Sequence, residues 1–156
     1  MPWTDPIRIA IDNNGNLYVT SPSTRQIFVL TSDGTILNTI TTFDRPLSIA
    51  IDSSGRLLVG DNRDKSVSVL DSDGQLLYEL GIGTREFGMP GDMVVVNDGV
   101  YVTDGPNDLI KVYDINSGSF IFSFGQGLFP NTDTSIGNTP LMFPTGIAYD
   151  PVYSEI

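Results

Sequence analysis

Short runs in which apolar residues alternate with polar or small ones recur along the chain. In the first run Ile7, Ile9 and Ile11 occupy every second position. This period of two predicts a β-strand with one face buried more deeply than the other. The pattern with its turn signals predicts strands at 7–11, 17–20, 26–30 and 35–40. Four short antiparallel strands make a small meander, which cannot bury both its faces alone.

The same arrangement begins again at Pro46, and residues 46–80 match 6–40 without a gap. Turn glycines coincide, as Gly15 does with Gly55, and so do apolar strand positions. A third copy starts at Pro90 and a fourth at Pro144. Helix formers are scarce, while Gly, Asp, Asn, Ser, Thr, Ile and Val are abundant. A repeat of this composition predicts an all-β array of small sheets.

Several elements of this repeat resemble the NHL repeat of β-propellers. They are P-x-x-I-A-I-D, G-x-L-Y-V, I-x-V-L and S-D-G-x-x-L, and the segments GIGTREFGMP (81–90) and PTGIAYD (144–150) are especially close. The resemblance covers essentially the chain from Pro6 onward. It implies a single domain over 1–156, a partial β-propeller of four-stranded antiparallel blades. The blades are expected at about 6–45, 46–89 and 90–143, with an incomplete blade at 144–156.

Members of this family usually form six blades, so the resemblance implies that other blades complete the ring. They come either from the rest of a longer chain or from a second copy. In a pair of chains the extra strand at 144–150 would compete with the partner's strand at 7–12. The interpretation as a fragment of a longer protein is therefore favoured.

Charge and composition narrow the range of partners. The net charge is −11, and Lys65 and Lys111 are the only lysines. Binding of nucleic acid or anionic lipid depends on clustered Lys and Arg, so neither partner is expected. No segment approaches the roughly 20 apolar residues of a membrane span, and no secretion signal is present in this segment. Few lysines, abundant Asn, Ser and Thr, and family habit favour an extracellular or periplasmic location.

The absence of histidine and cysteine removes the commonest general base, the activated Ser and Cys nucleophiles and most zinc sites. Carboxylates remain. Asp12, Asp52 and Asp150 occupy equivalent positions after the first strand, where clustered oxygens could hold calcium. The alternative is that each begins an ordinary turn and accepts backbone N–H bonds. This structural interpretation is favoured, so no cofactor is expected, and calcium is the one cofactor that these carboxylates would allow.

The charged loop 61–65 and its counterpart 104–108 are better candidates for function, because partners usually dock on the rim loops of a rigid scaffold. The alternative is a solvated loop with one internal aspartate hydrogen bond per blade. Trp3 and Phe129 are also of interest, since the repeat does not explain them, whereas Phe43, Phe87 and Leu141 are expected to pack between blades. The candidate partner-binding residues are Asp61, Arg63, Asp64, Lys65, Asp104, Asn107 and Phe129.

These observations favour a non-catalytic propeller that presents its loops to a protein or carbohydrate partner. The alternative is part of a calcium-dependent propeller lyase or lactonase whose active-site residues lie largely outside this segment. RNA binding, known in some animal NHL proteins, conflicts with the acidic charge.

Overall fold

The computed structural model describes residues 4–83, 86–125 and 141–152. Within these ranges the chain forms three four-stranded antiparallel sheets, and a short 3-10 turn, Gly105–Asn107, lies in the third. In each sheet the strands lie side by side in chain order. The predicted all-β class and four-stranded repeat are therefore confirmed.

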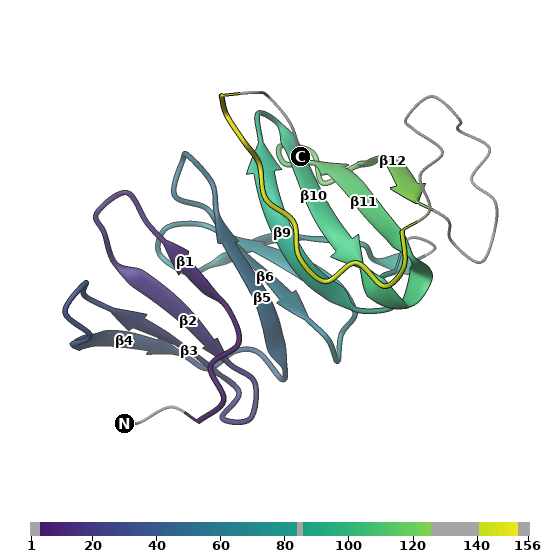
Figure 1. Ribbon diagram of the computed structural model, residues 1–156. Helices are drawn as coiled ribbons and strands as arrows, with labels where there is room; N and C mark the ends of the chain where they lie inside the picture. Colours follow the sequence, from purple (N-terminus) through teal and green to yellow (C-terminus); the bar gives the residue numbers. More distant parts are fainter. Residues whose placement is uncertain (1–3, 84–85, 126–140, 153–156) are drawn as a thin grey trace.

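We call the three sheets blades 1, 2 and 3; Figure 1 shows them following one another through the molecule. Blade 1 consists of β1 (Ile9–Ile11), β2 (Leu17–Ser21), β3 (Gln26–Leu30) and β4 (Ile36–Ile40). Blade 2 consists of β5 (Pro46–Ile51), β6 (Leu57–Asp61), β7 (Ser66–Leu70) and β8 (Leu76–Leu80). Blade 3 consists of β9 (Pro90–Val96), β10 (Gly99–Asp104), β11 (Leu109–Asp114) and β12 (Phe120–Gly125).

Because successive antiparallel strands reverse direction, their connections alternate between the two ends of a blade. One end, which we call the turn end, carries the tight turns such as 12–15, 52–55 and 71–74. The other, the linker end, carries the loops between the second and third strands and the linkers between blades. At the turn end Asp12 Oδ1 accepts the backbone N–H groups of Asn14 (2.9 Å) and Asn16 (2.8 Å). Gly15 completes that turn at a φ of 83°, which glycine adopts without a Cβ clash.

The core lies between the blades rather than within them. Between blades 2 and 3 the buried cluster includes Leu58, Leu80, Phe87 and Tyr113. Between blades 1 and 2 a smaller buried cluster includes Phe43. The prediction that Phe43 and Phe87 pack between blades is confirmed.

Three residues at equivalent places in the loops of the linker end have left-handed backbones although none is glycine. Arg25, Lys65 and Asp108 have φ values of 58°, 55° and 56°. A side chain in this region costs of order 1–3 kcal/mol unless its surroundings offset the strain.

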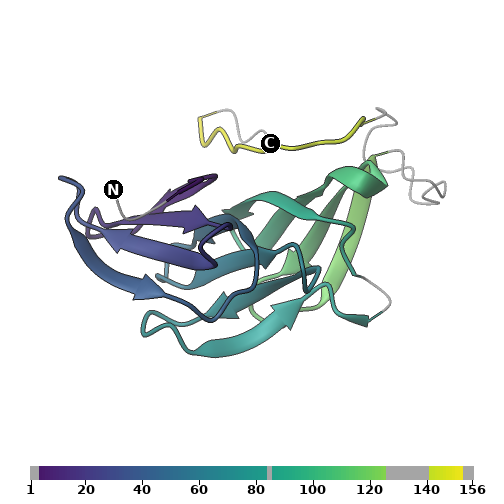
Figure 2. The ribbon, with the colours of Figure 1, turned by 90° about the horizontal axis from the view of Figure 1, so that it is seen from below.

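The prediction of a strand over 144–150 is wrong. Residues 144–149 form no strand, and Asp150 makes only an isolated bridge. The first strand of a blade pairs with the second strand of that blade, and the described chain contains no such strand for this copy. The segment instead passes over blade 3 and runs along its first strand, β9, as Figure 1 shows, and Figure 2 shows it lying to one side of the sheets. Arg8 donates to the Thr145 carbonyl (2.9 Å), and the Ile147 N–H donates to Asp92 (3.3 Å).

Candidate functional site

Asp61, predicted to bind a partner, lies beneath the linker end and is 1% exposed. Its Oδ2 accepts the backbone N–H groups of Asp44 (2.9 Å) and Arg45 (2.8 Å), in the linker that enters blade 2. Its Oδ1 accepts the N–H of Arg63 at 2.8 Å. Asp61 therefore fastens the linker between blades 1 and 2 to the loop after β6, and its carboxylate is turned inward.

Asp104 does the same for the next linker and is fully buried. Its Oδ1 accepts the N–H groups of Gly88 (2.9 Å) and Met89 (3.1 Å). Its Oδ2 forms an ion pair with Lys111 Nζ (2.9 Å) and accepts a bond from Asn107 Nδ2 (2.8 Å). For Asp61, Asp104 and Asn107 the geometry thus favours the internal hydrogen bond, one of the two interpretations open from the sequence.

The side chains of Arg63, Asp64 and Lys65 are exposed at this end. Burial and the neighbouring carboxylates of Asp61 and Asp44 raise the pKa of Asp64, and Arg63 offsets only part of this rise. Two further candidates, Trp3 and Phe129, lie outside the described residues, as does most of the 125–143 insertion.

Arg63 belongs to a pocket of about 470 Å³ at the linker end, between blades 1 and 2. Arg25 and Arg63 each form an ion pair of 3.3 Å with Asp44, and their side chains are 64% and 66% exposed. We call this the arginine pocket; its lining residues are Pro22, Arg25, Asp44, Arg45, Asn62 and Arg63.

Sequence reasoning missed Arg25 and Arg45 because they occupy different positions of the repeat, and only the fold brings them to Arg63. One signal could have found them. Of the eight basic residues of the chain, Arg25, Arg45, Arg63 and Lys65 all fall in connections of the same end. In an acidic chain, four basic residues in the connections of one end indicate that this end carries a basic surface.

The three carboxylates considered for calcium lie in the turn geometry that the sequence also allowed. Besides its two backbone bonds, Asp12 accepts a bond from the Asn16 side chain at 2.8 Å. Asp52 forms an ion pair with Arg56 at 2.7 Å, and Asp150 accepts the N–H of Val152 at 2.8 Å. Among the residues that the structure describes, no three carboxylates gather closely enough to hold a metal ion.

These turns make the fold sensitive to acid. Burial raises the pKa of Asp12 and Asp52, but hydrogen bonds from Asn16 and Arg56 outweigh it, so both pKa values lie below the ordinary 3.8. A carboxylate with a lowered pKa stabilises the fold above its unfolded-state pKa, and this contribution disappears as pH falls through the folded-state value. The free energy of unfolding, measured with urea, should therefore change little through these groups between pH 7 and 5 and fall below about pH 4.

Asp52→Asn is the matched variant for this expectation. It should be less stable than the parent at pH 7 and should lose less stability on acidification. An equal loss in both proteins between pH 5 and 3 would contradict the assignment to this turn.

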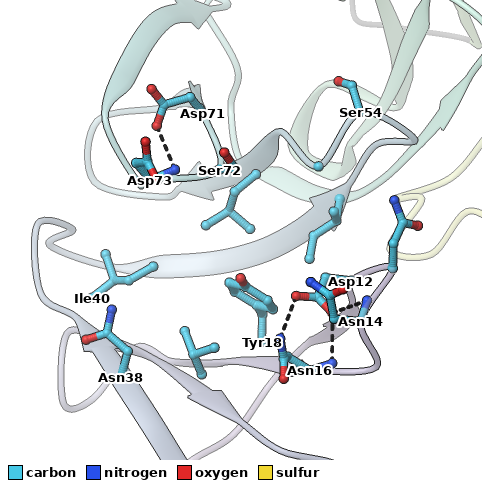
Figure 3. Close-up of a pocket in the computed structure, with 16 residues that line it drawn as sticks. Asp12, Asn14, Asn16, Tyr18, Asn38, Ile40, Ser54, Asp71, Ser72 and Asp73 are labelled. Atoms are coloured by element: carbon cyan, nitrogen blue, oxygen red, sulfur yellow. Dashed lines mark hydrogen bonds between the residues drawn. The ribbon is translucent and has the colours of Figure 1, made fainter.

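A second, larger pocket of about 560 Å³ opens at the turn end, also between blades 1 and 2. Tyr18, Val29 and Ile40 line it from blade 1, and Ile51 and Leu57 line it from blade 2. Figure 3 shows polar side chains from three turns around these residues. We call it the seam pocket; its other lining residues are Asp12, Asn13, Asn14, Asn16, Asn38, Ser54, Gly55, Asp71, Ser72, Asp73 and Gly74.

Comparison with known proteins finds no matching family model and no matching curated protein. Solved structures do match. Hydrazine synthase of Kuenenia stuttgartiensis has a TM-score of 0.66 at 19% identity, over 79% of this chain and 36% of that one. Virginiamycin B lyase of Staphylococcus aureus, solved in an inactive form with quinupristin, has a TM-score of 0.64 at 22% identity, over 80% and 43%. Sqt1 of Saccharomyces cerevisiae has a TM-score of 0.65 at 13% identity, over 78% and 35%.

These structures share the propeller architecture. The chain is a partial β-propeller. It spans less than half the length of each of these three structures. At such identities the similarity establishes the fold alone, because propellers support many unrelated functions. In the described part of this propeller no helix is long and apolar enough to cross a membrane.

Proposed function

We propose that this chain is part of an NHL-type recognition propeller, non-catalytic, that binds a protein or carbohydrate partner outside the cytoplasm. The arginine pocket is the observation that carries the proposal. Three arginines and a single carboxylate line it, and two of these arginines form ion pairs with that carboxylate, in a chain whose net charge is −11. The planar fork of arginine matches a carboxylate with two parallel hydrogen bonds. The partner is therefore one that offers carboxylates, an acidic peptide segment or an acidic sugar.

The arginines differ in how they are held. Arg25 and Arg63 share Asp44, whereas Arg45 forms no ion pair with any described residue. The backbone of Arg45 is nevertheless fixed, because its N–H donates to the buried Asp61. A fixed backbone with an uncommitted guanidinium lowers the ordering cost of binding.

Replacement of Arg45 by Gln should weaken binding of a carboxylate ligand about tenfold or more, since a hydrogen bond to a charged group contributes roughly 1.5–3 kcal/mol. The probes are a hexaglutamate peptide and a short oligogalacturonate, titrated by calorimetry at low ionic strength. Affinity should also fall steeply as salt is added.

Arg56→Gln is the control, because it removes the same charge at the turn end. Equal weakening by Arg45→Gln and Arg56→Gln would show that net charge, not this pocket, governs binding. Failure of both probes to bind at low salt would overturn the proposal.

The alternative, part of a calcium-dependent lyase or lactonase, would be favoured by a rise in melting temperature with calcium that EDTA reverses. We also propose that further blades, from a longer chain or a second copy, complete the ring. Ile9 and Ile11 of β1 support this. Their apolar side chains are 57% and 63% exposed, and exposed apolar side chains of this kind are typical of a surface that another part of an assembly covers.

A further inference from the structure

We propose that the seam pocket binds a neutral carbohydrate unit, at the opposite end of the blades from the arginine pocket and independently of it. The proposal starts from a difference between two seams that the repeat would otherwise make alike.

At the turn end of the seam between blades 2 and 3, long side chains fill the corresponding space. Arg56 reaches across to the Ile115 carbonyl (3.1 Å) and to Asn116 Oδ1 (3.3 Å). The Tyr78 hydroxyl donates to the same Ile115 carbonyl. Ile115 itself is buried in the core between these blades. Three side chains thus close this seam from both sides.

The seam between blades 1 and 2 carries shorter residues at all three equivalent positions. Asn16 stands where blade 2 has Arg56, and Asn38 stands where it has Tyr78. Ser72, which follows the first aspartate of its turn, stands where blade 3 has Ile115. All three line the seam pocket. The cavity therefore results from three substitutions at one seam and is not a general property of the fold.

The interior of the seam pocket offers both kinds of surface that a sugar needs. Its volume falls within the roughly 300–1,000 Å³ usual for small-molecule sites. The apolar residues and the Tyr18 ring supply a surface for C–H groups, and Figure 3 shows Tyr18 between the two blades. The Tyr18 hydroxyl, the Ser72 hydroxyl and the Asp73 carboxylate form no hydrogen bond with other described residues. These free donors and acceptors suit the hydroxyls of a polyol.

Charge selects among polar ligands. The lining contains Asp12, Asp71 and Asp73 and neither lysine nor arginine. Acidic sugars and phosphates are therefore repelled here. Oxygens of Asp12 and Asp71 are committed to the N–H groups of their turns, as the bond from Asp73 N to Asp71 Oδ1 (2.9 Å) shows. A neutral saccharide uses the remaining amides, hydroxyls and the free Asp73 carboxylate without requiring charge compensation.

The experiment is a two-dimensional NMR titration of the isotope-labelled chain with three neutral disaccharides: maltose, cellobiose and N,N′-diacetylchitobiose. At least one should shift the side-chain amide signals of Asn14, Asn16 and Asn38 and the backbone signals of 71–74, with a millimolar Kd. The signals of Arg25, Arg45 and Arg63 should stay in place, which separates this proposal from the one for the arginine pocket.

The double variant N38Y/S72I copies the filled seam into the open one and should abolish these shifts. Tyr18→Phe is a second variant that keeps the test valid if the double variant folds poorly. It keeps the ring, removes only the hydroxyl, and should weaken binding several-fold. Asn62→Tyr, at the arginine pocket, should leave binding unchanged. The proposal is overturned if no disaccharide shifts the named signals, if shifts persist undiminished in N38Y/S72I and Tyr18→Phe, or if only a cation such as spermidine produces them.

Discussion

Asp104→Asn is expected to lower the free energy of unfolding by about 3–5 kcal/mol, because it leaves the buried ammonium of Lys111 without its counter-charge. The two side chains are 0% and 10% exposed, and their atoms lie 2.9 Å apart. Urea unfolding, followed by the circular dichroism of the backbone in the far ultraviolet, measures the change.

A double-mutant cycle with Lys111→Met separates the pair from its parts. The double variant Asp104→Asn with Lys111→Met should recover a substantial share of the loss, since no buried charge then remains. Asp98→Asn, an exposed carboxylate of the same blade, should stay within about 0.5 kcal/mol of the parent. Equal losses for Asp98→Asn and Asp104→Asn would mean that burial of the pair is unimportant.

Phe87→Ala should destabilise the chain by a similar amount, about 3–5 kcal/mol, because it removes a large side chain from the centre of the core between blades 2 and 3. Phe87 is 1% exposed, and its ring centroid lies 5.6 Å from that of Tyr113. Lys111 Nζ lies 5.0 Å from the centroid of the Phe87 ring, so the variant also loses a cation–π contact.

The urea midpoint of Phe87→Ala should fall without a large change in the slope of the transition. Phe87→Leu, which retains much of the volume, should recover more than half of the loss. Phe143→Ala serves as the control, because Phe143 is 53% exposed. A loss in Phe143→Ala as large as in Phe87→Ala would contradict the importance of this core position.

The strands and turns could be predicted because their determinants are local. The alternation of apolar residues that forms β5 and the glycine at position 55 that forms the next turn each depend on only a few neighbouring residues. The repeat also presents each of these patterns several times along the chain. The strand expected at 144–150 was wrong for the opposite reason. Its pattern is that of a first strand, but a strand forms only when a neighbour accepts its hydrogen bonds.

The sites depended on residues that the sequence does not place together. The loop around Arg63 was predicted, but Asp61 in the same loop is buried by the linker that crosses it. No sequence pattern indicated the seam pocket. Asn38 and Tyr78 are both acceptable on the fourth strand of a blade, and the difference between them matters only where that strand faces the turn of the next blade.

Under the function proposed for the arginine pocket, the left-handed backbone of Arg25 sets stability against recognition at one position. Glycine would adopt a φ of 58° without the steric penalty of a Cβ atom, and the exposed ion pair with Asp44 contributes little. Arg25→Gly would thus be neutral or stabilising while it removes one of the three guanidinium groups. A chain optimised for stability alone would place glycine there, so under the proposed function the arginine marks a position where the most stable residue and the residue that binds the partner differ.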